Sequence, residues 1–118
     1  MIKGIGTDIE EVGRIRSRME SEAFLAKCFL PEEIAYAIAR PDPAQHLAAR
    51  FCAKEAFAKA CGSPQKWHEV MVASSPSGAP FLVLSGSAAR ALAGCRVHLS
   101  MSHTRHSAHA VVIIEEIS

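Results

Sequence analysis

The chain has 118 residues, of which 49% are hydrophobic and 21% are charged, and its formal net charge is +1 at pH 7. This balance is typical of a single globular domain over residues 1–118, and the small net charge argues against a nucleic-acid-binding protein. No apolar run of about 18 residues is present, so we expect no membrane span. Charged side chains occur too early for a signal peptide, and we therefore expect a cytoplasmic protein.

Hydrophobic periodicity and the positions of glycine and proline predict one strand, four helices and then mostly strands. The expected elements are a strand ending near Asp8 or Ile9, helices over 10–21, 21–30, 31–40 and 44–60, strands over 67–74 and 81–86, a helix over 87–94, and strands over 96–104 and 107–117. Ser21 and Pro31 are typical of helix starts, and Gly62 is typical of a helix end. This order predicts an α+β domain, with an antiparallel sheet that carries its helices on one side.

The helix predicted over 44–60 contains the run RFCAKEAFAKA, in which two faces can be separated at about 100° per residue. One face is a stripe of small or apolar residues, which predicts close packing: Ala49, Cys52, Ala53, Ala56, Phe57 and Ala60. The other half of the wheel carries Arg50, Lys54, Glu55 and Lys59. This half can be an ordinary solvated surface with a Glu55–Lys59 pair, or a site for an anionic ligand, which its excess of cations favours.

Asp8 follows two glycines at the end of the first predicted strand, in the run GIGTD. Glycine lets a strand approach another element closely, so Asp8 can reach the charged helix. Carboxylates are hard oxygen ligands that suit Mg²⁺, which phosphate oxygens of a substrate often complete. Asp8 and Glu55 are therefore candidate Mg²⁺ ligands, with the neighbouring cations on phosphates.

The histidines offer a rival metal site, because the run HTRHSAH places His103, His106 and His109 at a spacing of three. Imidazole is a common zinc ligand, but this spacing on a strand sends successive side chains to opposite faces. Scattered surface histidines are the simpler interpretation. Nucleophilic catalysis is a third option, because Ser100, Ser102 and His103 are close in sequence, although no G-x-S-x-G motif is present.

Three segments together carry a family resemblance. They are GIGTDIEEVGRI at 4–15, RFCAKEAFAKACG at 50–62, and GAPFLVLSG at 78–86 followed by LSMSHTRHSAHAVVIIE at 99–115. In this order, they resemble the holo-[acyl-carrier-protein] synthases, the small single-domain type of 4′-phosphopantetheinyl transferase. The resemblance implies that fold, and a role in fatty acid biosynthesis.

The resemblance also implies a reaction, in which the phosphopantetheine arm of coenzyme A moves to a serine of apo acyl carrier protein and adenosine 3′,5′-bisphosphate is released. Asp8 and Glu55 match the Mg²⁺ ligands, and Glu55 or a metal-bound water helps to remove the serine proton. Lys59 matches the lysine that steadies the pyrophosphate. Residues that match the coenzyme A site, including its 3′-phosphate, are Arg50, Lys54 and His103. The family further implies a homotrimer with active sites between subunits.

Two further features bear on these expectations. The run RIRSR is the densest basic stretch, and since acyl carrier proteins are acidic, we expect Arg14 and Arg18 to contact the carrier protein. Family members commonly carry GTG after the lysine helix, whereas this chain has Gly62-Ser63-Pro64, and proline offers no N–H to a phosphate. That departure is the one feature that favours an alternative function, a non-catalytic module that binds a nucleotide or a carrier protein.

Overall fold

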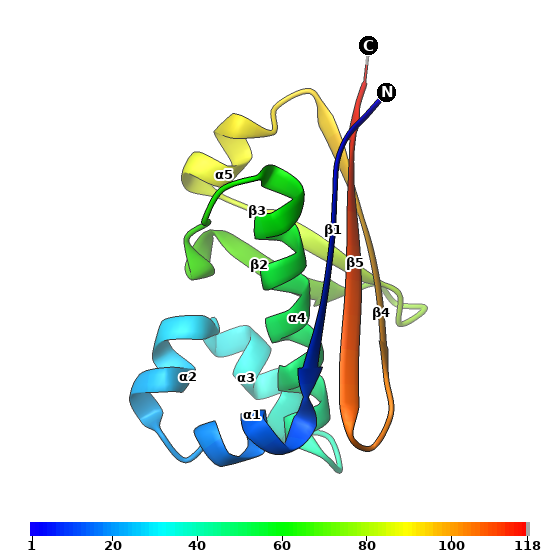
Figure 1. The fold of residues 1–118 in the computed structure, drawn as a ribbon. Helices are drawn as coiled ribbons and strands as arrows, with labels where there is room; N and C mark the ends of the chain where they lie inside the picture. Colours follow the sequence, from blue (N-terminus) through cyan, green and yellow to red (C-terminus); the bar gives the residue numbers. More distant parts are fainter. Residues whose placement is uncertain (118) are drawn as a thin grey trace.

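The computed structural model describes residues 1–117. Its elements in chain order are β1 (Ile2–Glu11), α1 (Val12–Arg18), α2 (Glu22–Cys28), α3 (Pro31–Ile38), α4 (Pro43–Cys61), a 3₁₀ turn η1 (Trp67–Glu69), β2 (Val70–Ser74), β3 (Pro80–Leu84), α5 (Gly86–Ala91), β4 (Cys95–His103) and β5 (Ser107–Glu116). The predicted α+β class is confirmed, because all the helices lie on one side of an antiparallel sheet (Figure 1). None of the helices in the described part is long and apolar enough to cross a membrane.

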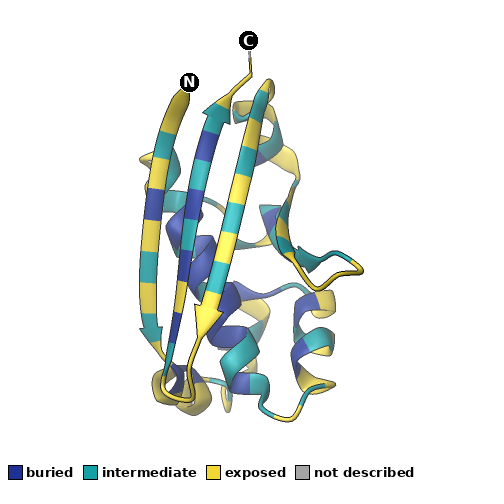
Figure 2. Ribbon diagram, turned by 90° about the vertical axis from the view of Figure 1, so that its right-hand side faces the viewer, coloured by how far each residue is buried: buried dark blue, intermediate teal, exposed yellow. Residues whose placement is uncertain are grey.

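The main sheet has the order β1-β5-β4 with both pairs antiparallel, and β2 and β3 form a separate hairpin. The long helix α4 packs along β1 and β5, while α1 and α3 lie against its other sides (Figure 1). The opposite face of the sheet has no helix over it within residues 1–117 (Figure 2). The fold is therefore a helix layer on a sheet that is open on its far side.

Glycines in β1 set the distance between this strand and α4. A Cβ atom added to Gly6 would lie 2.0 Å from the Ala56 carbonyl oxygen, and one added to Gly4 would lie 2.0 Å from that of Ala60. No side chain fits at either position, so the strand lies directly on the alanine stripe of the helix. The prediction that these glycines permit a close approach is confirmed.

The first strand is longer than expected and ends at Glu11, where it still pairs with Ser107 of β5. The placement of Glu10 and Glu11 in the first turn of the following helix was therefore wrong, since ladder pairing with β5 holds both in the strand. Other boundaries are close to those expected. The Ser21 hydroxyl accepts from the Phe24 N–H, and Gly62 ends α4 with a left-handed conformation at φ 76°.

The helical wheel of α4 correctly predicted which residues form its buried stripe. It did not predict that two residues of its charged half are buried as well. Ala49, Cys52 and Ala53 are buried, as expected. Arg50 and Lys54, however, are only 2% and 3% exposed. The physical reason is that α4 packs against the sheet on one side and against α1, α3 and β2 on others, so little of its circumference reaches water.

Candidate active site

Asp8, Glu55 and Lys59 meet where β1 crosses α4. Because strand side chains alternate, Asp8 projects on the same face as Gly6, toward the helix. The Lys59 ammonium donates to the Asp8 carboxylate at 3.2 Å and to the Thr7 carbonyl at 3.0 Å. The structure thus brings together the three residues to which the sequence assigned the chemistry.

The carboxylates crowd one another. Burial, followed by the negative charge of Asp8, raises the pKa of Glu55, and Glu10 acts in the same direction. The thiol of Cys52 lies beneath this group, and burial together with the charges of Asp8 and Glu10 raises its pKa to about 12. Lys59 balances only part of this negative charge. A bound cation would offset the rest.

A divalent ion fits this chemistry without a complete protein cage. Within residues 1–117, no group of three histidine, cysteine or acidic side chains is arranged to hold a metal ion. Mg²⁺, however, is commonly held by one or two carboxylates, with water and substrate phosphates in the other positions. Asp8 and Glu55 satisfy that requirement.

Glu10 was missed as a member of this site. Asp8 and Glu10 are two residues apart in one strand, so they share a face, and Glu10 also lies 3.5 Å from Arg14. Period-two alternation would have identified it if the strand had been predicted to extend to Glu11.

A cleft of about 410 Å³ opens beside these residues, and we call it the α4 cleft. It is lined by Lys54, Glu55, Ala58, Lys59, Gly62, Ser63, Pro64, Gln65, Lys66, Trp67 and Val70. The helix contributes the charged Glu55 and Lys59, and the segment after the helix contributes Pro64, Trp67 and Val70 together with more polar residues. The N–H groups of Gly62 and Ser63 donate to carbonyls of the last helical turn, so this turn offers phosphates little backbone hydrogen bonding.

Arg50 and His103 lie in a second pocket, of about 180 Å³, which we call the arginine pocket. The guanidinium carbon of Arg50 lies 4.0 Å from the ring centroid of Tyr36, and the His46 and His103 rings pack at 5.7 Å. The buried Nε of Arg50 has no hydrogen-bond partner, which suits an anionic ligand. Tyr36 and His46 were missed because nothing in the sequence marks them as neighbours of Arg50.

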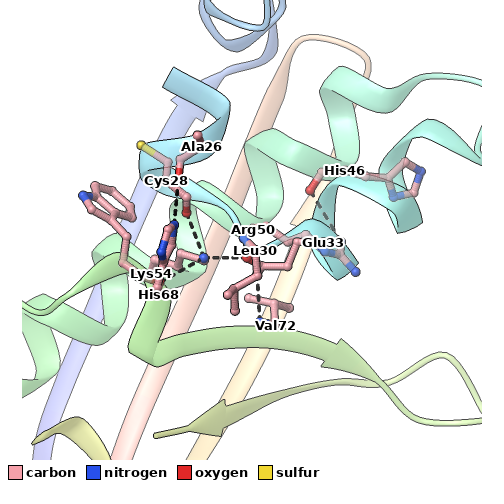
Figure 3. Close-up of polar contacts among 10 residues, drawn as sticks. Ala26, Cys28, Leu30, Glu33, His46, Arg50, Lys54, His68 and Val72 are labelled. Carbon is pink, nitrogen blue, oxygen red and sulfur yellow. Dashed lines mark hydrogen bonds and ion pairs between the residues drawn. The ribbon is translucent and has the colours of Figure 1, made fainter. Parts of the chain in front are cut away.

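The remaining predicted residues have different surroundings. Lys54 is enclosed, and its ammonium contacts Glu33 at 2.6 Å, which the sequence did not indicate (Figure 3). Arg14 is exposed on α1, and Arg18 lies over the Phe24 ring at 4.3 Å. The histidines do not gather, since His109 bonds Thr7 on the open sheet face while His103 is in the arginine pocket.

Comparison with known proteins gives a consistent result. Residues 4–112 match the family model of the 4′-phosphopantetheinyl transferase superfamily. The chain is 46% identical to a holo-[acyl-carrier-protein] synthase of Anaeromyxobacter sp. (strain K), an alignment that covers 98% of this chain and 97% of the relative. It is 42% identical to the synthase of Treponema denticola, over 98% and 99% of the two chains.

Solved structures agree. The holo-[acyl-carrier-protein] synthase of Neisseria meningitidis superimposes with a TM-score of 0.88 at 34% identity, over 98% of this chain and 100% of that one. A synthase from Bacillus anthracis in complex with CoA (3′,5′-ADP) gives a TM-score of 0.85 at 31% identity, over 98% of each chain. The expected fold and enzyme class are thus confirmed, and the chain belongs to the 4′-phosphopantetheinyl transferase superfamily.

Proposed function

We propose that this chain transfers the 4′-phosphopantetheine arm of coenzyme A to a serine of apo acyl carrier protein and releases adenosine 3′,5′-bisphosphate. The names of its relatives support both substrates. The observation that carries the proposal is the contact of Lys59 with Asp8, next to Glu55, at the edge of the α4 cleft. Fatty acid biosynthesis and a cytoplasmic location remain predictions.

The reaction forms a bond between the serine oxygen and the phosphorus that carries the arm, and it breaks the bond from that phosphorus to the departing nucleotide phosphate. Glu55 is placed to accept the serine proton, because it lines the α4 cleft beside Lys59, where the reacting phosphate would lie. Lys59 provides positive charge for the pyrophosphate oxygens, on which charge accumulates as the leaving group departs.

Asp8 and Glu55 are the residues that would hold Mg²⁺. The excess negative charge at the site supports this assignment. A bound Mg²⁺ would supply charge stabilisation to the pyrophosphate oxygens. Glu10, held by Arg14, would keep the surroundings acidic.

Arg50 and His103 would bind the 3′-phosphate of coenzyme A in the arginine pocket. The unpartnered Nε of Arg50 supports this, since a buried guanidinium is best satisfied by a phosphate. The arginine pocket and the α4 cleft share no lining residue, so one chain carries the predicted residues in two separate places.

A homotrimer with shared sites accounts for this separation. The open face of the sheet carries exposed Ile5 and Ile9, at 65% and 68%, and Ile5 pairs with Ile113 across the ladder. Exposed isoleucines on an uncovered sheet face are typical of an interface between copies. Light scattering of the purified protein tests the trimer.

Carrier protein would dock on α1, through exposed Arg14 and through Arg18 on the Phe24 ring. Arg16 is engaged elsewhere, since its guanidinium donates to both carboxylate oxygens of Asp42, at 2.9 and 3.1 Å. This leaves Arg14, 3.5 Å from Glu10, as the arginine of α1 beside the acidic site, and an acidic partner would be steered there.

Mass spectrometry of apo acyl carrier protein, incubated with the protein, coenzyme A and Mg²⁺, tests the proposed function. A mass gain of one phosphopantetheine arm is expected with the parent protein and with a Glu20→Ala control, and none with Asp8→Ala. If the parent protein binds coenzyme A but produces no mass gain, the non-catalytic binding module is the better description.

A further inference from the structure

The ammonium group of Lys54 has no hydrogen-bonding capacity left for a ligand. It donates to the Cys28 carbonyl at 2.8 Å and to Glu33 Oε1 at 2.6 Å (Figure 3), and also to the Trp67 carbonyl at 3.2 Å. A lysine ammonium has three donors, and each of these contacts uses one. The side chain is only 2% exposed. These contacts argue against the direct coenzyme A contact that the resemblance implied.

The partner of Lys54 is equally occupied. Glu33 is 1% exposed, and besides the ammonium it accepts from the Leu30 N–H at 2.9 Å and from the Val72 N–H at 2.9 Å. Lys54 and Glu33, which we call the buried pair, thus join α4 to the α2–α3 connection and to β2.

Two of these bonds hold the two ends of the short segment 67–72. Trp67 receives Lys54 at its carbonyl, and Val72 gives its N–H to Glu33. Trp67, at the first anchor point, and Val70, between the two, also line the α4 cleft, and we call them its apolar wall. The Trp67 ring itself stacks on Phe51 at 5.1 Å. The buried pair therefore fixes the backbone that carries the apolar wall of the cleft.

The apolar wall lines the same cleft as Lys59 and Glu55. In the proposed function, the reacting phosphate lies at Lys59 and Glu55, and the pantetheine arm is bonded to that phosphate. Ala58, Pro64 and Trp67 line this cleft without charge, and the charged Lys54 and Lys66 line it as well. An arm with apolar methyl groups and amides suits such a wall.

We propose that the buried pair is a positioning device for the α4 cleft: Lys54 holds the Trp67 segment in place and so sets the affinity for the pantetheine arm without touching the ligand. The proposal rests on the proposed function, because it takes coenzyme A as the substrate. Lys54 is a positioning residue, and Trp67 is the residue that contacts the arm.

Trp67 is the only tryptophan of the chain, so its fluorescence reports this segment directly. In Lys54→Met, we expect the emission to shift to longer wavelength and quenching by acrylamide to increase. Lys27→Met, which removes an exposed lysine from α2, is the matched control and should leave both unchanged.

Two ligands separate positioning from direct contact. Calorimetric titration of Lys54→Met should show coenzyme A binding weakened about tenfold, while adenosine 3′,5′-bisphosphate, which lacks the arm, stays within about twofold, and kcat stays within about threefold. Equal weakening of both ligands with unchanged Trp67 emission would mean that Lys54 binds phosphate directly, and it would overturn the proposal. Unchanged coenzyme A affinity would also overturn it.

Two further variants keep the test decisive if Lys54→Met does not fold. The double variant Glu33→Gln with Lys54→Met leaves no unpaired charge buried and should show the same selective loss of coenzyme A affinity. Trp67→Ala keeps the buried pair and removes the wall, and it too should weaken coenzyme A but not adenosine 3′,5′-bisphosphate. If Trp67→Ala binds both ligands normally, the cleft wall has no such role. The fluorescence and binding measurements need no carrier protein, so failure of the transfer reaction is seen separately.

Discussion

Lys54 and Lys59 lie about 1.4 turns apart on one helix, yet they occupy opposite kinds of surroundings. Lys54 is sealed in the buried pair, with every ammonium donor bonded within the protein. The Lys59 side chain is 56% exposed at the α4 cleft and touches one carboxylate and one carbonyl. The two lysines look alike in the motif, and the difference teaches that burial decides which of them can serve a substrate.

The balance of charge also differs between the surroundings of Lys54 and those of Lys59. Burial lowers the pKa of Lys54, and the neighbouring Glu33 carboxylate opposes that change. At the cleft, burial and the charge of Asp8 raise the pKa of Glu55, and Lys59 opposes that change only in part. The buried pair is neutral overall and closed, whereas Asp8, Glu10 and Glu55 at the edge of the cleft leave a surplus of negative charge that a bound cation would offset.

The largest effect should come from breaking the buried pair. Glu33→Ala leaves the Lys54 ammonium buried without its counter-ion and removes acceptors from Leu30 and Val72. We expect a loss of about 3–5 kcal/mol in the free energy of unfolding. Denaturant unfolding measures it, with Glu32→Ala, an exposed neighbour in the same helical turn, as the control. A loss no larger than that of the control would contradict the contrast between the two lysines.

The second effect belongs to the cleft. Lys59→Ala removes positive charge from the place where the leaving group develops negative charge, so kcat should fall by about 100-fold. Because the side chain is exposed, the free energy of unfolding should change by less than about 1 kcal/mol. The transfer assay and denaturant unfolding on the same preparation check both. A variant that keeps near-normal kcat would place the chemistry elsewhere.

A third prediction extends the comparison to Arg50, which is as buried as Lys54 but has a nitrogen left unpartnered. If that nitrogen serves a ligand, Arg50→Ala should weaken adenosine 3′,5′-bisphosphate binding about tenfold, in line with a lost charged hydrogen bond. Calorimetric titration measures this, and Arg90→Ala on α5 is the matched control. Equal affinity for parent and variant would remove Arg50 from the ligand site.

The smallest effect on the reaction is expected at the exposed arginines, which lie neither in the buried pair nor in the α4 cleft. Arg14→Glu should raise the apparent KM for carrier protein several-fold, leave that for coenzyme A unchanged, and flatten the salt dependence, because surface charges mainly affect association. Steady-state kinetics at two ionic strengths measures this, with Arg90→Glu as the control. If both KM values move together, the docking surface lies elsewhere.

Much of the fold follows from local signals in the sequence. Ser21 and Gly62 act at helix ends as expected, and the alanine stripe of α4 is buried against the sheet. The sequence also indicated that the GIGTD strand lies close to the KEAFAK helix, because glycines before a carboxylate allow a strand to approach another element closely. The helix ends and the alanine stripe depend on residues near one another in the chain, and the strand–helix contact depends on the absence of side chains at two glycines.

The surroundings of each charged side chain were decided by the tertiary structure alone. A helical wheel assigns residues to directions but does not say how many directions are covered, and α4 is covered on several. Glu33 reaches Lys54 from 21 residues away, and it turns a candidate ligand contact into a structural pair. Arg50 and Lys59, nine residues apart on one helix, line separate pockets for the same reason. Burial and pairing are properties of the packed chain, because they depend on which distant segments displace water from a side chain.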